Sequence, residues 1–259
     1  MNAHEGTPMK APATILIHGA TGRMGRALVA VASLTEGIIV RGYIDTRNPG
    51  REPLDHLPFF DHIPDGKPTV DAVVDFSRPE GVVSLVGVLW GSGVRVVSGT
   101  TGLGDAEREL LEKYSEETAL FYDDNMSYGV SIIKQLVETA GRMFRDVADV
   151  DVVEYHHRGK RDHPSGTAHG LVRALDPNAV VVEGQGAPPA GKRVVRTHSV
   201  RAGGIPGEHH VHFSMDDEVV TISHRALSRE VFARGALRAV SFIVGKPPGL
   251  YSMRDLTGG

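Results

Sequence analysis

The first half of the chain alternates short apolar runs with segments that have apolar residues at helical spacing. Short apolar runs are typical of buried parallel strands, and the alternation with helices predicts a parallel sheet covered on both faces. Strands are expected at Thr14–His18, Ile38–Ile44, Val70–Phe76, Arg95–Ser98 and Ala119–Tyr122. Helices are expected at Arg23–Ser33, Pro79–Gly91 and Ala106–Glu117, and Pro49–Lys67 is expected to be mostly loop.

The pattern changes near Asn125–Tyr128, where we expect a domain boundary. Beyond it, runs of alternating apolar and polar residues are typical of half-buried strands and predict an α+β domain with a mixed or antiparallel sheet. Strands are expected at Val150–His156, Val194–Arg201, His209–Phe213 and Val219–Leu227. Helices are expected at Val130–Arg145, Gly166–Ala174 and Glu230–Val244.

Composition narrows the classes of function. A chain of 259 residues with 41% apolar residues is typical of a globular protein, and the net charge of −4 gives no general reason to bind nucleic acid or an anionic membrane. The absence of Cys excludes disulfides and thiol nucleophiles. The longest apolar stretches, such as Ala27–Leu34, are far shorter than the roughly 20 residues that span a bilayer.

A glycine-rich segment, Gly19-Ala-Thr-Gly22-Arg-Met-Gly25, directly follows the first predicted strand and opens a helix. Such a turn lets the backbone and the helix N-terminus approach a pyrophosphate, although it also serves as a tight turn without a ligand. Asp45 ends the second strand, where an acidic residue typically contacts the adenosine ribose. It alternatively starts a turn, and Arg47 is placed to meet a 2′-phosphate instead, so NAD and NADP both remain open.

A second glycine-rich segment, Gly99-Thr-Thr-Gly102, follows the fourth predicted strand. Ligands of open α/β sheets bind at this edge, so the segment is a candidate for contact with the nicotinamide half of a cofactor. A turn without a ligand is the alternative.

The densest group of ionisable residues spans Glu154–Asp162 at the end of a predicted strand. His, Lys and Arg here are suited to carboxylate binding and proton transfer, although a solvated basic loop is the alternative. Pro164–Ala168 follows, with Ser165 as a candidate N-cap of a helix whose first amides face outward. Together the two segments predict a carboxylate or phosphate pocket, separate from the glycine-rich turn and suited to a substrate.

Nine of the 13 histidines lie between His156 and His224. His210 and His212 share one strand face while His209 points the other way, and no third ligand has metal-binding spacing. We therefore expect no metal site and interpret this strand as lying near the anion pocket or at an interface. Beyond His156 and His157, the other seven of these histidines receive no role.

These segments together resemble the 4-hydroxy-tetrahydrodipicolinate reductase (dihydrodipicolinate reductase) family, whose members are nicotinamide-dependent enzymes of lysine and diaminopimelate biosynthesis. The resemblance runs from about Ile15 to Leu256. It is carried by GATGRMG at 19–25, VDFSRPE at 74–80, GTTG at 99–102, NMSYGVS at 125–131, EYHHRGKRDHPSGTA at 154–168, SVRAGGIPGEHHVHF at 199–213 and GKPPGLYSMRD at 245–255.

The resemblance implies a fold and a set of site residues. It implies a Rossmann-like α/β cofactor domain of residues 14–127 with 229–259 and an α+β substrate and oligomerisation domain of residues 128–228. Residues 1–13 contain two Pro and no apolar run, so we expect them to be a flexible leader. It implies His156 as the general acid/base residue and Lys160 as the proton donor, with His157, Ser165, Gly166 and Thr167 binding the substrate carboxylates. The implied cofactor contacts are Gly19, Ala20, Thr21, Gly22, Arg23, Met24, Asp45, Gly99, Thr100, Thr101, Asp123, Asp124, Asn125 and Met126.

The same resemblance implies NADH or NADPH as cofactor, a small cyclic dicarboxylate substrate and a cytoplasmic homotetramer assembled through the sheet of the second domain. Two departures stand out. Gly159 replaces a bulkier polar residue, and Asp123-Asp124 replaces a frequent Ala-Pro beside the expected nicotinamide site. The alternatives are a reductase of another cyclic imine or keto-acid, an amino-acid dehydrogenase with the same cofactor domain, and a nucleotide-binding homologue without turnover.

Overall fold

The computed structural model describes residues 11–46, 57–64, 68–184 and 193–258. Most of the expected leader, part of the expected 49–67 loop and Arg47 lie outside these residues. Within the leader, Ala13 already begins the first strand, because its amide bonds to the Gly37 carbonyl at 2.8 Å.

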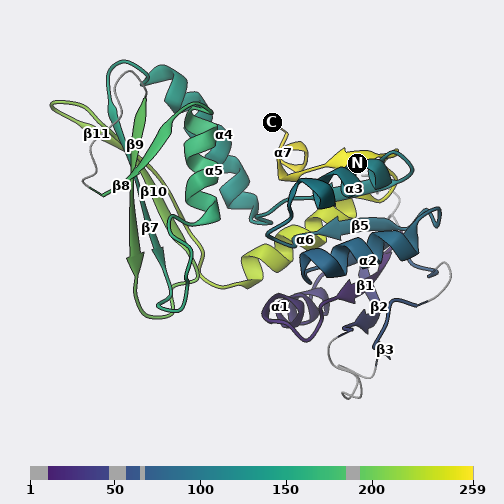
Figure 1. Cartoon of the computed structure of the whole chain (residues 1–259). Helices are drawn as coiled ribbons and strands as arrows, with labels where there is room; N and C mark the ends of the chain where they lie inside the picture. The colour runs from purple at the N-terminus through teal and green to yellow at the C-terminus, as the bar shows by residue number, and fades with distance from the viewer. Residues whose placement is uncertain (1–10, 47–56, 65–67, 185–192, 259) are drawn as a thin grey trace, which may run out of the picture. The chain divides into compact units, whose positions relative to one another are not determined.

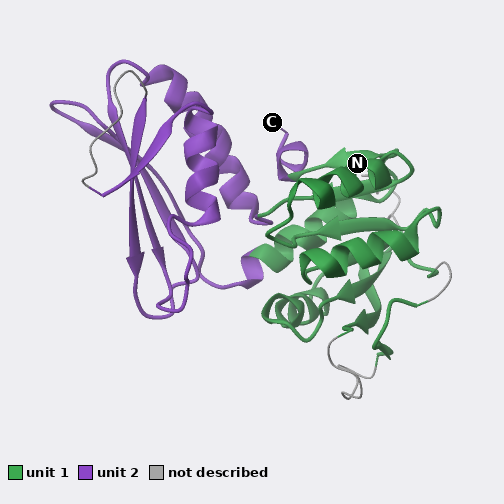
Figure 2. Ribbon diagram, viewed as in Figure 1, with its two compact units in different colours: residues 1–124, 232–252 green, residues 125–231, 253–259 purple. Residues whose placement is uncertain are grey.

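The chain forms two compact units, each built from two separate stretches of sequence (Figure 2). The first unit contains residues 1–124 and 232–252, and the second contains residues 125–231 and 253–259. The structure differs from the expected division, because the second unit begins at residue 125, continues to residue 231 and also contains residues 253–259. They pack there through α7 (Met253–Leu256), whose Arg254 donates to Glu138.

The first unit contains a parallel sheet of seven strands in the order β12-β6-β5-β4-β1-β2-β3. Its central strands are almost fully buried, which explains why they read as continuous apolar runs in the sequence. The strands are β1 (Ala13–His18), β2 (Ile38–Ile44), β3 (Phe59–Phe60), β4 (Ala72–Asp75), β5 (Arg95–Ser98), β6 (Ala119–Tyr122) and β12 (Gly249–Tyr251).

Helices cover both faces of this sheet (Figure 1). Apolar residues of α2 (Pro79–Leu89) and α3 (Asp105–Ser115) form one core with Leu120 of β6. The next residue of β6, Phe121, faces the other way and stacks edge-on against Phe242 of α6 (Glu230–Ile243), 6.2 Å between ring centroids. The remaining helix of the unit, α1 (Arg23–Ala32), follows the glycine-rich turn.

The second unit contains a mixed sheet of five strands in the order β11-β10-β7-β9-β8. Strands β10 and β11, and β10 and β7, pair antiparallel, whereas β7 and β9, and β8 and β9, pair in parallel. The strands are β7 (Asp149–His156), β8 (Val180–Glu183), β9 (Val194–Arg201), β10 (Glu208–Ser214) and β11 (Val219–Arg225).

Two helices, α4 (Tyr128–Met143) and α5 (Gly166–Leu175), pack against one face of this sheet (Figure 1). The core between these helices and the sheet includes Ile133, Val152, Leu171 and Phe213. Because strand side chains alternate, the residues between the core positions face the other side of the sheet. We call this side the open face. It carries Tyr155, His210 and His212.

The predicted α/β fold class with a second, mixed-sheet domain is confirmed. Four short elements were not predicted: β3, β8, β12 and α7, none longer than four residues. Among the described residues, no helix has the combination of length and apolar character needed to cross a membrane.

Candidate active site

The glycine-rich turn connects β1 to α1, and its shape depends on the absence of side chains. Gly19 has a φ of 78°, and a Cβ there would be 2.6 Å from the Phe76 carbonyl oxygen. A Cβ on Gly25 would be 2.3 Å from the Gly19 carbonyl oxygen. The N-cap of α1 is Gly22, which has no capping side chain. The turn therefore keeps its backbone close-packed and the helix N-terminus bare, as dinucleotide binding requires.

Asp45 lies directly after β2 and is 2% exposed. Its Oδ2 accepts hydrogen bonds from the backbone amide of Thr21, at 3.1 Å, and from the Thr21 hydroxyl. Asp45 also lines a cavity of about 330 Å³ whose other lining residues are His18, Gly19, Thr46, Ile63, Ser77, Arg78, Glu80, Gly81 and Ser84. The structure thus brings the predicted acidic residue and the glycine-rich turn to one cavity. Arg47, the alternative contact for a 2′-phosphate, lies outside the described residues.

A buried cluster lies beneath the carboxyl ends of β1, β4 and β5. Its centre is Asp75, which is completely buried and accepts from Ser77 at 2.6 Å, Ser98 at 2.8 Å and Thr100 at 2.6 Å. The fourth partner is His18, whose Nδ1 is 2.8 Å from Asp75 Oδ1. We call these five residues the Asp75 cluster. Burial acts to raise the pKa of Asp75, but the hydrogen bonds from His18, Ser77 and Thr100 outweigh it and lower that pKa.

The Asp75 cluster also explains the second glycine-rich segment. The Thr100 side chain is 3% exposed and turns inward to Asp75, while its hydroxyl accepts from the Ser77 amide at 3.0 Å. A Cβ on Gly99 would be 2.4 Å from the ring of Phe76. Two loops that line the carboxyl edge of the sheet are therefore held together by side chains, of which sequence reasoning singled out Thr100 alone.

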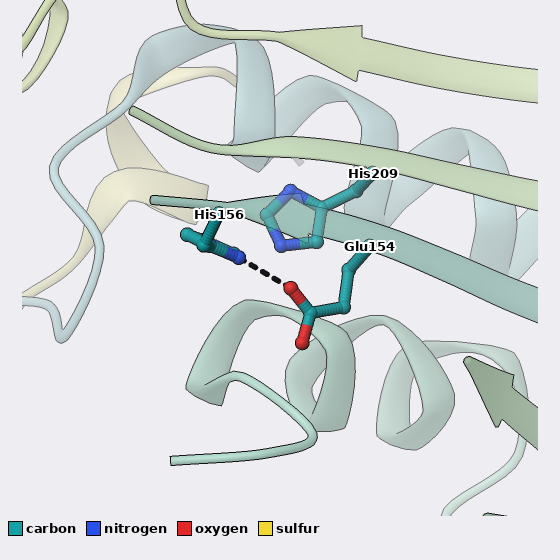
Figure 3. A group of neighbouring side chains, drawn as sticks. All are labelled: Glu154, His156 and His209. Atoms are coloured by element: carbon teal, nitrogen blue, oxygen red, sulfur yellow. Dashed lines mark hydrogen bonds and ion pairs between the residues drawn. The ribbon is translucent and has the colours of Figure 1, made fainter. Parts of the chain in front are cut away.

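His156 is the last residue of β7, and its ring pairs through Nδ1 with the Glu154 carboxylate (Figure 3). Lys160 lies in the loop that follows, where its Nζ donates to Asp162 Oδ2 at 2.7 Å. His157 accepts from the Lys160 amide through its carbonyl, at 3.0 Å. Each of the two predicted proton-transfer residues thus contacts a carboxylate that the sequence did not assign.

The predicted anion-binding helix begins where expected, with Ser165 as the N-cap of α5. The Ser165 hydroxyl accepts from the Ala168 amide at 3.2 Å and contacts His209 Nε2 at 3.0 Å. Around Gly166, the position of a Cβ is open space. The Thr167 hydroxyl accepts from the Asn125 side-chain amide at 2.8 Å. Asn125 therefore lies beside the predicted substrate residues rather than apart from them.

The chain passes from the first unit to the second within the 123–126 segment. Asp123 donates from its amide to the Ser98 carbonyl at 3.3 Å, next to the Asp75 cluster. Asp123 and Asp124 belong to the first unit, whereas Asn125 and Met126 belong to the second. Met126 is 1% exposed, so its side chain is part of the packed interior.

His209 was given no role from the sequence, and the structure places it between Ser165 and His156. It is 3% exposed, contacts Ser165 and stacks edge-on against His156 with ring centroids 5.2 Å apart (Figure 3). Burial lowers the pKa of His209 to about 3, and neighbouring His156 acts in the same direction, so the ring is neutral. The alternation along β10 already pointed His209 toward the helix side of the sheet.

Glu154, His156 and His209 also form the one group of three potential metal ligands among the described residues. Arg201 binds the Glu154 carboxylate, with Nη1 2.9 Å from Oε2 and Nη2 2.6 Å from Oε1. A guanidinium at this distance repels a second cation, and His209 Nε2 already contacts Ser165. The Glu154 carboxylate is therefore engaged by His156 and Arg201, and His209 by Ser165.

The fold narrows the class of protein. The dihydrodipicolinate reductase from Paenisporosarcina superposes with a TM-score of 0.72 at 20% identity, covering 93% of this chain and 97% of that one. That likeness is one of fold. Combined with the glycine-rich turn and its cavity, it defines a protein of two structural units whose first unit has a Rossmann-like parallel sheet.

Sequence comparison identifies the family within that class. The profile "Dihydrodipicolinate reductase, N-terminus" matches residues 13–126, and "Dihydrodipicolinate reductase, C-terminus" matches residues 129–257. The 4-hydroxy-tetrahydrodipicolinate reductase of Xanthomonas campestris is 41% identical over 246 residues, which is 95% of this chain and 98% of the relative. The enzyme of the same name from Halorhodospira halophila is 38% identical over 261 residues, covering 93% and 97%. The chain belongs to the dihydrodipicolinate reductase family.

Proposed function

We propose that this chain reduces 4-hydroxy-tetrahydrodipicolinate to tetrahydrodipicolinate, with NADH or NADPH as reductant. The ring gains a hydride and a proton and loses its 4-hydroxyl group as water. The observation that carries the proposal is the juxtaposition of His156 and Ser165 around His209 at the start of α5. It occurs in a chain that the family profiles match over residues 13–126 and 129–257. The Paenisporosarcina reductase with the same fold binds dipicolinate, which is a cyclic dicarboxylate.

The cofactor would bind at the glycine-rich turn and the Asp45 cavity. When bound, the reduced nicotinamide supplies a hydride. The bare N-terminus of α1 would hold the pyrophosphate, while Asp45 would accept from the ribose hydroxyls. Gly99 and Thr101 would contact the nicotinamide half through the loop that Thr100 fixes to Asp75. An acid at position 45 suits NADH, and use of both cofactors remains part of the proposal.

The substrate carboxylates would bind at the N-terminus of α5. The Ser165 hydroxyl already contacts the Ala168 amide and His209. The backbone amides of Gly166 and Thr167, at the start of α5, would therefore donate the hydrogen bonds to the carboxylate. Lys160 would add positive charge from the preceding loop, and the His157 imidazole would add a hydrogen-bond donor. One carboxylate held in this way orients the ring for hydride addition.

The matching proton would come from His156 or Lys160. Glu154 pairs with His156 Nδ1, which leaves Nε2 as the nitrogen that exchanges a proton with substrate. Lys160 Nζ carries three donors, of which Asp162 takes one. Either group is chemically suited to deliver a proton to the carbon or nitrogen opposite the hydride.

The decisive experiment supplies the purified protein with the lysine-pathway substrate and follows the loss of reduced-cofactor absorbance, with NADH and NADPH in parallel. Lys160→Ala should lower kcat by about 10²-fold or more while the affinity for cofactor stays within about twofold. Glu138→Gln is the control, because this half-buried glutamate of α4 pairs with Arg142 and Arg254 rather than with the proposed site residues. Turnover of another cyclic imine or keto-acid alone would favour the related-reductase alternative, and binding without turnover of any of them would favour a non-catalytic homologue.

We further propose a cytoplasmic homotetramer without nucleic-acid or membrane partners. The support for assembly is the open face of the five-stranded sheet, which no helix of its own unit covers among the described residues. The net charge of −4 and the absence of Cys agree with the remaining parts of the proposal. Sedimentation of the purified protein measures its assembly directly.

A further inference from the structure

Glu154 is a buried carboxylate at the candidate active site with no exposed surface. It lies two residues before His156 on β7, and strand alternation places both side chains on the helix-covered side of the sheet. His156 pairs with Glu154 Oε2 through Nδ1, and its other ring nitrogen, Nε2, faces Gly207, where a Cβ would be 3.1 Å away. The glycine therefore leaves room beside the nitrogen that is not held by Glu154.

Arg201 holds the carboxylate from the neighbouring strand. In the parallel pairing of β7 with β9, Arg201 is the register partner of His156. Its guanidinium binds Glu154 through both terminal nitrogens, at 2.9 and 2.6 Å. The same Nη2 donates to the carbonyl oxygen of Asp162 at 2.8 Å. Because the Asp162 side chain accepts from Lys160 Nζ, one guanidinium connects the segments of both proton-transfer residues.

The charge state of Glu154 follows from these contacts. Burial acts to raise its pKa, but hydrogen bonds from His156, Arg201 and Ser199 outweigh it and lower the pKa of Glu154 to about 2. The group is therefore a carboxylate at neutral pH and can only accept hydrogen bonds. A carboxylate next to Nδ1 selects the tautomer that carries its proton there and leaves the Nε2 lone pair for proton exchange.

We propose that Glu154 and Arg201 are a positioning pair for the proton-transfer step. Glu154 fixes the orientation and tautomer of His156, and Arg201 fixes both Glu154 and the backbone of the loop that carries Lys160. This inference rests on the proposed function, since it assigns a task to residues around the proposed acid and base.

A double-mutant cycle tests the proposal. Glu154→Gln should lower kcat by about 10²-fold while the affinity for cofactor stays within about twofold. In a His156→Ala background, the same change should lower kcat by no more than about threefold further, because its effect passes through the imidazole. The matched control is Glu138→Gln, which removes another Glu–Arg contact of the second unit and should leave kcat unchanged.

Equal losses in both backgrounds would assign Glu154 a general structural role and overturn the proposal, as would wild-type kcat in Glu154→Gln. The proposed function would instead be overturned if the wild type showed no turnover, or if His156→Ala had the same kcat as the wild type. Nitrogen-15 spectra of the imidazoles separate the two failures, because they report the tautomer without activity. His156 should carry its proton on Nδ1 in the wild type at pH 8, and a proton on Nε2 would overturn the positioning role.

Loss of Glu154 leaves the half-buried Arg201 guanidinium without its carboxylate partner and can prevent folding. Arg201→Lys covers this case, because it keeps the positive charge but cannot bind the carboxylate with two parallel hydrogen bonds. It should lower kcat by about tenfold in the wild-type background, and by a smaller factor in the His156→Ala background. An unchanged kcat in a folded Arg201→Lys variant would contradict the role of the guanidinium.

Discussion

Asp45 shows how one residue can serve the protein and its cofactor together. Its carboxylate is 2% exposed and binds the backbone and hydroxyl of Thr21, yet it also lines the cavity at the glycine-rich turn. The contact with Thr21 fixes the turn relative to β2. A ribose hydroxyl at this position would therefore meet a carboxylate that is already oriented.

Removal of the Asp45 carboxylate should weaken NADH more than NADPH. Asp45→Ala removes acceptors for the ribose hydroxyls, and the loss of a hydrogen bond to a charged group should raise the KM for NADH by roughly tenfold. NADPH should be affected less, because its 2′-phosphate is repelled by the same carboxylate. Initial rates with each cofactor measure the difference, and equal effects on both would contradict a ribose contact.

His209 gives the protein a pH-dependent stability. Its pKa in the folded state is about 3, below the 6.5 of an ordinary imidazole, so the unfolded chain binds more protons between these values. The free energy of unfolding should therefore fall as the pH drops from about 6.5 toward 3. His224, whose pKa burial also lowers, adds to this dependence.

Replacing the imidazole should flatten that dependence. His209→Gln keeps a polar group near Ser165 but does not titrate in this range, so its free energy of unfolding should fall less between pH 6.5 and 4. Urea unfolding at a series of pH values provides the measurement, and His62→Gln, an exposed histidine, is the control. A slope as steep as that of the wild type would assign the dependence to other groups.

At the scale of elements, the Asp75 cluster and the contacts of Asp71 mark opposite ends of the same strand. Asp75 binds side chains after β1, β4 and β5 at their carboxyl ends, where ligands bind. Asp71, just before β4, accepts from the amide and hydroxyl of Thr14, both at 2.7 Å. The two carboxylates thus perform similar packing tasks, only one of them next to the cofactor cavity.

This symmetry provides a matched pair of variants. Asp75→Asn should raise the dissociation constant for cofactor by about tenfold, because the loops carrying Ser77 and Thr100 lose their common anchor. Each of the two variants should lower the free energy of unfolding of the first unit by about 1–3 kcal/mol, but Asp71→Asn should leave cofactor binding unchanged. Isothermal titration and thermal unfolding measure the two effects, and an equal loss of cofactor affinity in both variants would show that the cluster acts through stability alone.

Elements with strong local patterns could be predicted from the sequence, and elements defined by pairing could not. The buried strands β1 and β5 and the glycine-rich turn carry their own patterns, and β2 and β6 were predicted with their observed bounds. In contrast, β12 has three residues and exists because it pairs with β6, from more than 120 residues earlier. Its pattern is too short to be distinguished from a loop.

The same distinction applies to the candidate site. His156, Lys160 and Ser165 belong to one continuous segment, so the resemblance found them together. Glu154 occupies a buried position in the alternation of β7, but its partner Arg201 comes from β9, and no local pattern gives the register of two parallel strands. Glu154 and Asp162 lie in the same segment as the two proposed proton donors, but the pairing of Glu154 with Arg201 became visible only in the fold.

At the scale of the whole molecule, the open face of the five-stranded sheet is the surface that an assembly would use. Its side chains form a mixed layer in which His210 and His212 stack at 5.9 Å and Tyr155 meets His210 edge-on. Several strands contribute apolar residues to it, Val153 among them, opposite His210 in the register. Such a mixture of aromatic, aliphatic and polar groups is typical of protein interfaces.

A charge at the centre of this face should dissociate the proposed tetramer. Val153→Asp places a carboxylate on β7, where burial against a second subunit would leave it without a counter-charge. Sedimentation velocity should then show smaller species, with a distribution that depends on concentration. Val88→Asp, on the exposed side of α2, is the control. A wild type that is monomeric, or a Val153→Asp variant that assembles normally, would contradict assembly through the open face.

The passage of the chain between its two units has a consequence for how the protein can be divided. The chain crosses three times, and the last crossing brings Thr257 to Ser131 and Gln135 of α4, at 3.0 and 2.6 Å. A fragment of residues 125–231 would therefore lack the C-terminal segment whose Thr257 contacts α4, the first helix of that fragment. Neither unit is a contiguous module, so exchange of substrate units between relatives requires a transplanted C-terminus or a circular permutation.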